Sequence, residues 1–121
     1  MKIKIKSGSV EVEAELNSSE TAKKIFESLP LEGSVNTWGD EIYFDIPVSC
    51  EEENGQEEVE VGDLGYWLSG SCFCIFFGRT PVSTSDKPRA ASNVNVFGKI
   101  IGDTEILKQI RSGDQIIVEK I

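Results

Sequence analysis

Alternating apolar and polar residues dominate the start of the chain. Residues 2–6 read Lys-Ile-Lys-Ile-Lys and residues 10–16 read Val-Glu-Val-Glu-Ala-Glu-Leu, with Gly8 between the two runs. A period of two places every second side chain on one face of a β-strand, so the pattern predicts a hairpin with one buried face. Lys on the first strand and Glu on the second would add pairs of opposite charge across this hairpin.

The pattern then changes to a helical period. An apolar stripe with the spacing of one helix face is formed by Ala22, Ile25, Phe26 and Leu29. Asn and Ser at 17–19 are residue types that cap helix N-termini, and Pro30 cannot continue a helix. The sequence therefore predicts one short helix that packs its apolar stripe against a sheet or the end of a barrel.

Most of the remaining chain is typical of strands. Residues 31–47 predict two strands joined by a turn at Gly39-Asp40; the second carries Glu41, Tyr43 and Asp45 on one face and apolar residues on the other. The uncharged run 72–77 predicts a strand that is buried on both faces and ends at the Gly-Arg-Thr-Pro of 78–81. A polar stretch at 83–92 indicates an exposed loop, residues 94–102 and 115–121 further strands, and residues 106–110 a second short helix. Because no alternation of strand and helix is present, these elements favour a mainly β fold, a small closed barrel forming a single domain over 1–121.

Composition limits the classes of function. The formal net charge of −9 argues against nucleic-acid binding, which needs clustered Lys and Arg, and it disfavours anionic membranes. The N-terminal residues lack the apolar core of a signal peptide, no apolar run is long enough to cross a membrane, and the 3 Cys form an odd number. We therefore expect a cytoplasmic protein, a monomer or homodimer. The absence of His removes the commonest general base and metal ligand, and we expect no cofactor.

Two clusters of possible metal ligands are better explained as structure. Cys72 and Cys74 share one face of an apolar strand, where thiols are normally buried and inert. The Glu-rich run Cys50–Glu60 surrounds an Asn-Gly pair and is typical of a solvated loop or hairpin, and its spacing does not fit an EF-hand. We therefore predict no metal site.

Several segments resemble a known family in order along almost the whole chain. They are the opening Lys-Ile-Lys-Ile strand and the segments Asn36–Pro47, Val59–Trp67, Cys74–Pro81 and Pro88–Ile100. In these segments the chain is similar to the cyclophilin-like family of small, mostly uncharacterised bacterial and archaeal proteins. The resemblance implies a closed eight-stranded cyclophilin-like β-barrel with two short helices. Cyclophilins proper are peptidyl-prolyl isomerases, but their Phe-His and Phe-Met signatures are missing from this chain.

Candidate site residues gather around the turns that follow two of the predicted strands. We expect a concave face that binds a small ligand or a peptide segment, lined by Trp38, Glu41, Tyr43, Phe77, Arg79, Thr80 and Arg89. An Arg could donate to the imide nitrogen of an X-Pro bond, or it could bind a carboxylate with its guanidinium.

Three functions remain open. The first is a non-catalytic domain that binds a small molecule or a peptide. The second is a divergent peptidyl-prolyl isomerase in which Arg89 is the catalytic candidate. The third is an enzyme acting on an amide or carboxylate metabolite with Glu41 as acid–base, which would require partial burial to raise the pKa of that carboxyl.

Overall fold

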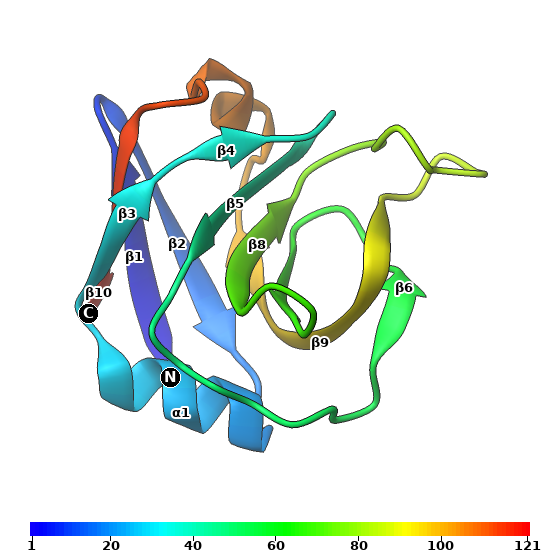
Figure 1. Cartoon of the computed structure of the whole chain (residues 1–121). Helices are drawn as coiled ribbons and strands as arrows, with labels where there is room; N and C mark the ends of the chain where they lie inside the picture. Colours follow the sequence, from blue (N-terminus) through cyan, green and yellow to red (C-terminus); the bar gives the residue numbers. More distant parts are fainter.

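The computed structural model describes all of residues 1–121 and contains one strongly curled β-sheet with an α-helix across one end (Figure 1). Its strands and helices are β1 Lys2–Ser7, β2 Val10–Leu16, α1 Glu20–Ser28, β3 Leu31–Ser34, β4 Asn36–Thr37, β5 Glu41–Asp45, β6 Gln56–Glu58, β7 Asp63–Trp67, β8 Cys72–Phe76, β9 Arg89–Ile101, the 3₁₀ helix η1 Glu105–Gln109 and β10 Gln115–Lys120. The strand order is β3-β10-β1-β2-β9-β7-β8-β5-β4, and β6 pairs with β9. All strand pairs are antiparallel, which agrees with the mainly β class expected from the sequence.

The N-terminal hairpin and the first helix form as predicted. In β1 and β2, Lys2 lies opposite Glu15 and Lys6 lies opposite Glu11. The side chain of Ser19 accepts a hydrogen bond from the backbone N–H of Ala22 at the start of α1. Ala22 and Ile25 are fully buried, so the apolar stripe of the helix closes one end of the core.

The prediction of a closed eight-stranded barrel was wrong. The sheet has 10 strands, and its two ends are β3 and β4, which follow each other along the chain but do not pair. The reason lies at Val35 between them, whose backbone bonds with Gly113 and Asp114 in the turn before β10. Before Val35 the chain pairs with β10 as β3, and after Val35 it pairs with β5 as β4. No single strand therefore joins the two ends of the sheet into a closed barrel.

Two further expectations need correction. The chain has one α-helix rather than two, because η1 is a short 3₁₀ turn in which Leu107 N–H bonds to Thr104 O and Ile110 N–H to Leu107 O. The predicted exposed loop at 83–92 ends early, since β9 begins at Arg89. The first residues of β9 pair with β6, where Glu58 lies opposite Arg89.

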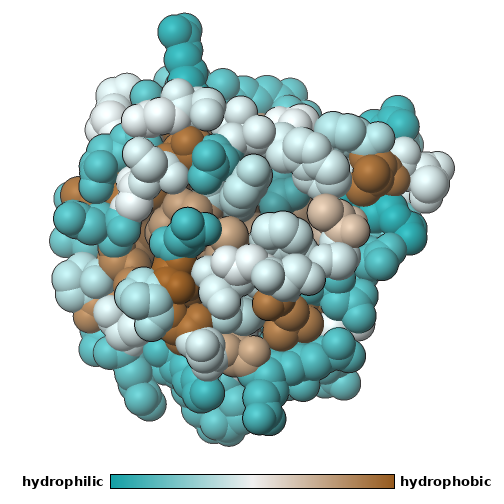
Figure 2. Space-filling view, in the orientation of Figure 1, coloured by the Kyte–Doolittle hydropathy of each residue, from teal (hydrophilic) through white to brown (hydrophobic).

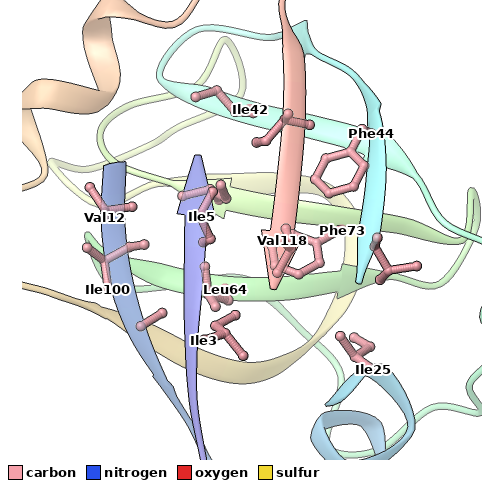
Figure 3. Packing of buried hydrophobic residues seen from close by; sticks show 14 of the residues in the cluster. Ile3, Ile5, Val12, Ile25, Ile42, Phe44, Leu64, Phe73, Ile100 and Val118 are labelled. Atoms are coloured by element: carbon pink, nitrogen blue, oxygen red, sulfur yellow. The ribbon is translucent and has the colours of Figure 1, made fainter. Parts of the chain in front are cut away.

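The sheet buries apolar side chains on both faces. The larger core lies inside the curl and combines Ile25 of α1 with residues from β1, β2, β5, β7, β8, β9 and β10 (Figure 3). The rings of Phe44 and Phe73 stack there with centroids 5.1 Å apart. A smaller cluster lies on the opposite face of β8, beneath the first half of β9, and consists of Val59, Cys72, Cys74, Phe76, Ala90 and Val94. Two cores explain why the run 72–77 is buried on both faces.

Hydrophilic residues cover much of the visible surface, with smaller hydrophobic areas between them (Figure 2). Of the large apolar side chains, the exposed ones are Met1, Val61, Val82, Ile101 and Ile121. No helix of this chain has both the length and the apolar composition needed to cross a bilayer.

Candidate functional site

A pocket of about 200 Å³ opens beside the smaller apolar cluster. Its lining comes from the turn before β5, from β5, from the end of β7 and from the start of β9, and consists of Trp38, Glu41, Tyr43, Trp67, Ala90 and Ala91. Glu41 is the one charged residue among them. The site is thus an aromatic and apolar hollow with a single carboxyl group.

A tight turn sets the positions of Trp38 and Glu41. The backbone N–H of Trp38 donates to the carbonyl oxygen of Glu41 at 3.0 Å, which closes a turn with Gly39 and Asp40 in the middle. Gly39 has φ +61°, and a Cβ there would lie 2.8 Å from the carbonyl oxygen of Arg79. A glycine with positive φ at the first central position is typical of a type II′ hairpin turn. The Gly39-Asp40 pair in the sequence therefore brings Trp38 and Glu41 to the same edge of the pocket.

Trp67, from the end of β7, is held in place by two contacts. Its indole N–H donates to Ser92 Oγ at 2.7 Å. A Cβ at Gly70 would lie 2.5 Å from two atoms of the indole ring, so the ring lies directly on this glycine. A hydrogen bond on one side and a glycine surface on the other fix the orientation of the ring before any ligand arrives.

Glu41 is buried without a hydrogen-bond partner for one of its oxygens. The residue is only 6% exposed, and Oε1 is the one buried side-chain oxygen or nitrogen of the chain that has no partner. Burial raises the pKa of Glu41 to about 7, and the neighbouring Cys74 thiol offsets this rise only in part. No basic side chain contributes to this pKa. The carboxyl group therefore titrates near neutral pH in a hollow that supplies no compensating positive charge.

The structure places three of the predicted site residues together, namely Trp38, Glu41 and Tyr43. The other four lie outside the pocket lining. Phe77 belongs to the larger core on the other face of the sheet. Arg79 is exposed, and its guanidinium lies 3.5 Å from the carbonyl oxygen of Ser83.

Thr80 and Arg89 make contacts that hold the chain between β8 and the start of β9. Thr80 is buried, and its hydroxyl donates to the carbonyl oxygen of Arg89 at 2.5 Å. The Arg89 guanidinium is bound to Glu57 of β6 at 2.6 Å. The lining residues absent from the predicted set are Trp67, Ala90 and Ala91; the small residues at 90 and 91 were visible in the sequence, but their place in a strand was not.

Comparison with known proteins gives a family for this chain. A family model described as Cyclophilin-like matches residues 1–119. The chain belongs to the cyclophilin-like family. Its fold is also that of a hypothetical protein from Archaeoglobus fulgidus, known from a solution structure, with 43% sequence identity, a TM-score of 0.84, and coverage of 100% of this chain and 95% of that one. No curated protein matches the sequence.

In this cyclophilin-like chain the acidic run at 51–60 supports the fold. The Glu53 carboxylate accepts hydrogen bonds at 3.0 Å from the backbone N–H groups of Glu20 and Thr21 at the start of α1, and these bonds lower its pKa. Asn95 is fully buried; it donates to the carbonyl oxygen of Glu51 at 2.8 Å and accepts from the N–H of Glu53 at 2.8 Å. The first half of the run is therefore a loop tied to the helix and to β9, and its second half contains the short strand β6.

The cysteines of this cyclophilin-like protein are free thiols. Cys72 and Cys74 are buried as predicted, and burial raises the pKa of Cys72 to about 12 and that of Cys74 well above its ordinary value. Both remain protonated at neutral pH and are poor nucleophiles. No group of three His, Cys, Asp or Glu side chains is arranged to hold a metal ion. Glu41 is thus the group in the pocket that can change its charge near neutrality.

Proposed function

We propose that this cyclophilin-like protein binds a small ligand or an extended peptide segment in the pocket between β5, β7 and β9. The observation that carries this proposal is the buried, unpaired Oε1 of Glu41 in an otherwise aromatic and apolar hollow. An unpaired polar atom in the interior lowers stability, so proteins generally pair such groups. A group kept in this state within a concave site is typical of a binding or catalytic position.

The size of the pocket indicates what part of a ligand it holds. Pockets for drug-sized molecules measure about 300–1,000 Å³. The volume here is about 200 Å³, below that range. We therefore propose that the pocket takes one compact group, either the head of a small molecule or a single side chain of a peptide.

A second candidate function is proton transfer by Glu41. A general acid or base works best when its pKa is close to the working pH, and the pKa of Glu41 is about 7. The isomerase alternative has less support, because the Arg89 guanidinium, its catalytic candidate, is bound to Glu57 rather than placed in the pocket lining. Both alternatives would still begin with binding at this pocket.

Tryptophan signals test the binding proposal directly. The chain contains 2 Trp, and both of them line the pocket, so indole fluorescence and the indole N–H resonances report on this site alone. The protein is titrated with cationic, neutral and anionic small molecules and with X-Pro peptides. Binding at the pocket should shift the indole signals, and Ala91→Leu, which fills the pocket from an exposed position, should weaken the response. Indole signals that stay constant with every compound would contradict the proposal.

A further inference from the structure

Three aromatic side chains and one carboxyl group form the walls of the pocket, and this combination selects for charge. Trp38 and Tyr43 come from the β5 side and Trp67 from β7, and Glu41 of β5 shares the lining with them. The face of an aromatic ring attracts cations, Trp most strongly, and aromatic cages recognise methylated ammonium groups. We infer that the pocket binds an alkylated ammonium group, with Glu41 as its counter-ion and the three aromatic rings as its walls. This inference rests on the binding function proposed above.

The carboxyl group lacks an internal counter-ion. Lys and Arg side chains are absent from the pocket lining. Arg89, the basic residue directly before the lining residue Ala90, is held by Glu57 at 2.6 Å. An arriving cation would therefore meet an uncompensated carboxylate in a partly desolvated site, where an ion pair is stronger than it is in water.

The number of polar partners distinguishes between kinds of ammonium. A primary ammonium such as that of Lys has three N–H donors, and each needs an acceptor when it is buried. The lining offers the Glu41 carboxylate, whose Oε1 is unpaired, and otherwise aromatic rings and alanine methyl groups. A tertiary ammonium has a single N–H for Oε1 and a quaternary one has none, so their alkyl groups can lie against the rings. The pocket therefore favours alkylated over unmodified amines.

The charge of the whole protein acts in the same direction. The formal net charge is −9 at pH 7, which attracts cations and repels carboxylates and phosphates in solution. This long-range field, the unpaired carboxylate and the aromatic walls are independent features, and all of them favour a cationic ligand. They also separate this inference from a carboxylate-binding role for Arg89, which would require an anionic ligand.

The test uses ligands matched in shape. Choline and the neutral 3,3-dimethylbutan-1-ol differ in charge but hardly in size, and N,N-dimethylethanolamine adds one N–H donor. Indole fluorescence and indole N–H resonances of the full chain are followed for each compound. We expect choline and N,N-dimethylethanolamine to bind at least about tenfold more tightly than the neutral alcohol. Peptides carrying dimethyl-lysine or unmodified lysine then distinguish a peptide side chain from a free small molecule as the source of the ammonium group.

Glu41→Gln and a pH series supply the second readout. Because the pKa of Glu41 is about 7, the fraction of carboxylate rises from about a tenth at pH 6 to about nine tenths at pH 8, so choline should bind about tenfold more tightly at pH 8. Cys72 and Cys74 of β8, the titratable groups that interact with Glu41, stay neutral in this range, and β7 and β9 place only Trp67, Ala90 and Ala91 in the lining. Glu41→Gln should bind choline weakly and equally at both pH values.

The possible results distinguish failure of the ammonium inference from failure of the binding function. If the neutral alcohol binds as tightly as choline, or if Glu41→Gln keeps full affinity with an unchanged fold, the ammonium inference is wrong. If anionic, neutral or X-Pro ligands shift the indole signals and ammonium compounds do not, the inference is wrong while the binding function stands. If no compound shifts those signals, both are wrong.

Discussion

Replacing Glu41 by Gln should stabilise the protein at alkaline pH and leave it almost unchanged at acidic pH. Glu41 has an ordinary pKa of 4.5 and a pKa of about 7 in the folded chain. Below pH 4.5 the carboxyl group is protonated in both the folded and the unfolded state, so it contributes no pH dependence. Between pH 4.5 and 7 the unfolded chain releases this proton first, and the free energy of unfolding falls as the pH rises.

The size of the effect follows from the two pKa values. A tenfold change in proton affinity corresponds to about 1.4 kcal/mol, so a rise from 4.5 to about 7 costs the folded state about 3 kcal/mol above pH 7. The amide of Gln stays neutral at every pH and avoids this cost. Urea unfolding at pH 4.5 and at pH 8 measures the free energy of both proteins. The difference between variant and wild type should grow from near zero to about 3 kcal/mol.

Subtracting the two proteins cancels the titration of all other groups, which makes this measurement specific for Glu41. Glu11→Gln is a matched control, because it removes the same charge from an exposed position on β2. The reasoning would be refuted if Glu41→Gln gave the same difference from wild type at both pH values, or if it were less stable than wild type at pH 8.

Three other substitutions test the surroundings of the pocket. Asn95→Ala removes a buried amide and leaves the Glu53 N–H and the Glu51 carbonyl oxygen without their partner, so it should lower the free energy of unfolding by about 2 kcal/mol in urea. A loss below about 1 kcal/mol would show that water replaces the amide. Gly70→Ala should displace the Trp67 ring, which would lie 2.5 Å from the new Cβ, and should reduce the indole response to ligand; an unchanged indole N–H resonance would contradict this. Arg89→Ala removes a surface ion pair and should change stability by less than about 1 kcal/mol in thermal unfolding, with choline affinity retained; loss of choline binding would return Arg89 to the site.

Local patterns predicted the elements that depend on neighbouring residues along the chain. The alternation of β1 and β2, the stripe and cap of α1 and the Gly39-Asp40 turn are set by residues within a few positions of each other, and all of them form. The start of β9 was missed because its polar residues enter the sheet through β6 and β7, which are distant in sequence. The closed barrel failed for the same kind of reason, since the change of partner at Val35 depends on the turn before β10.

The same distinction between local and long-range contacts separates the site residues that were predicted from those that were missed. Trp38, Glu41 and Tyr43 were found because one turn and one alternating strand bring them together. Trp67, Ala90 and Ala91 reach the pocket only because β7 and β9 pair within the same sheet as β5, and local sequence patterns do not predict which strands pair. The Arg89 guanidinium is bound by Glu57, whose acidic run was expected to form a solvated loop or hairpin, with no sign of this ion pair in the sequence.

A sheet that does not close usually exposes edges to which other chains can add, and this one leaves little for them. Its end strands are β3 with 4 residues and β4 with 2, and β6 beside β9 has only 3. A strand from a second copy would gain few backbone hydrogen bonds at such short edges, and short edges are a known protection against aggregation. The break at Val35 thus gives the chain an open topology without the template for uncontrolled assembly that open sheets commonly carry.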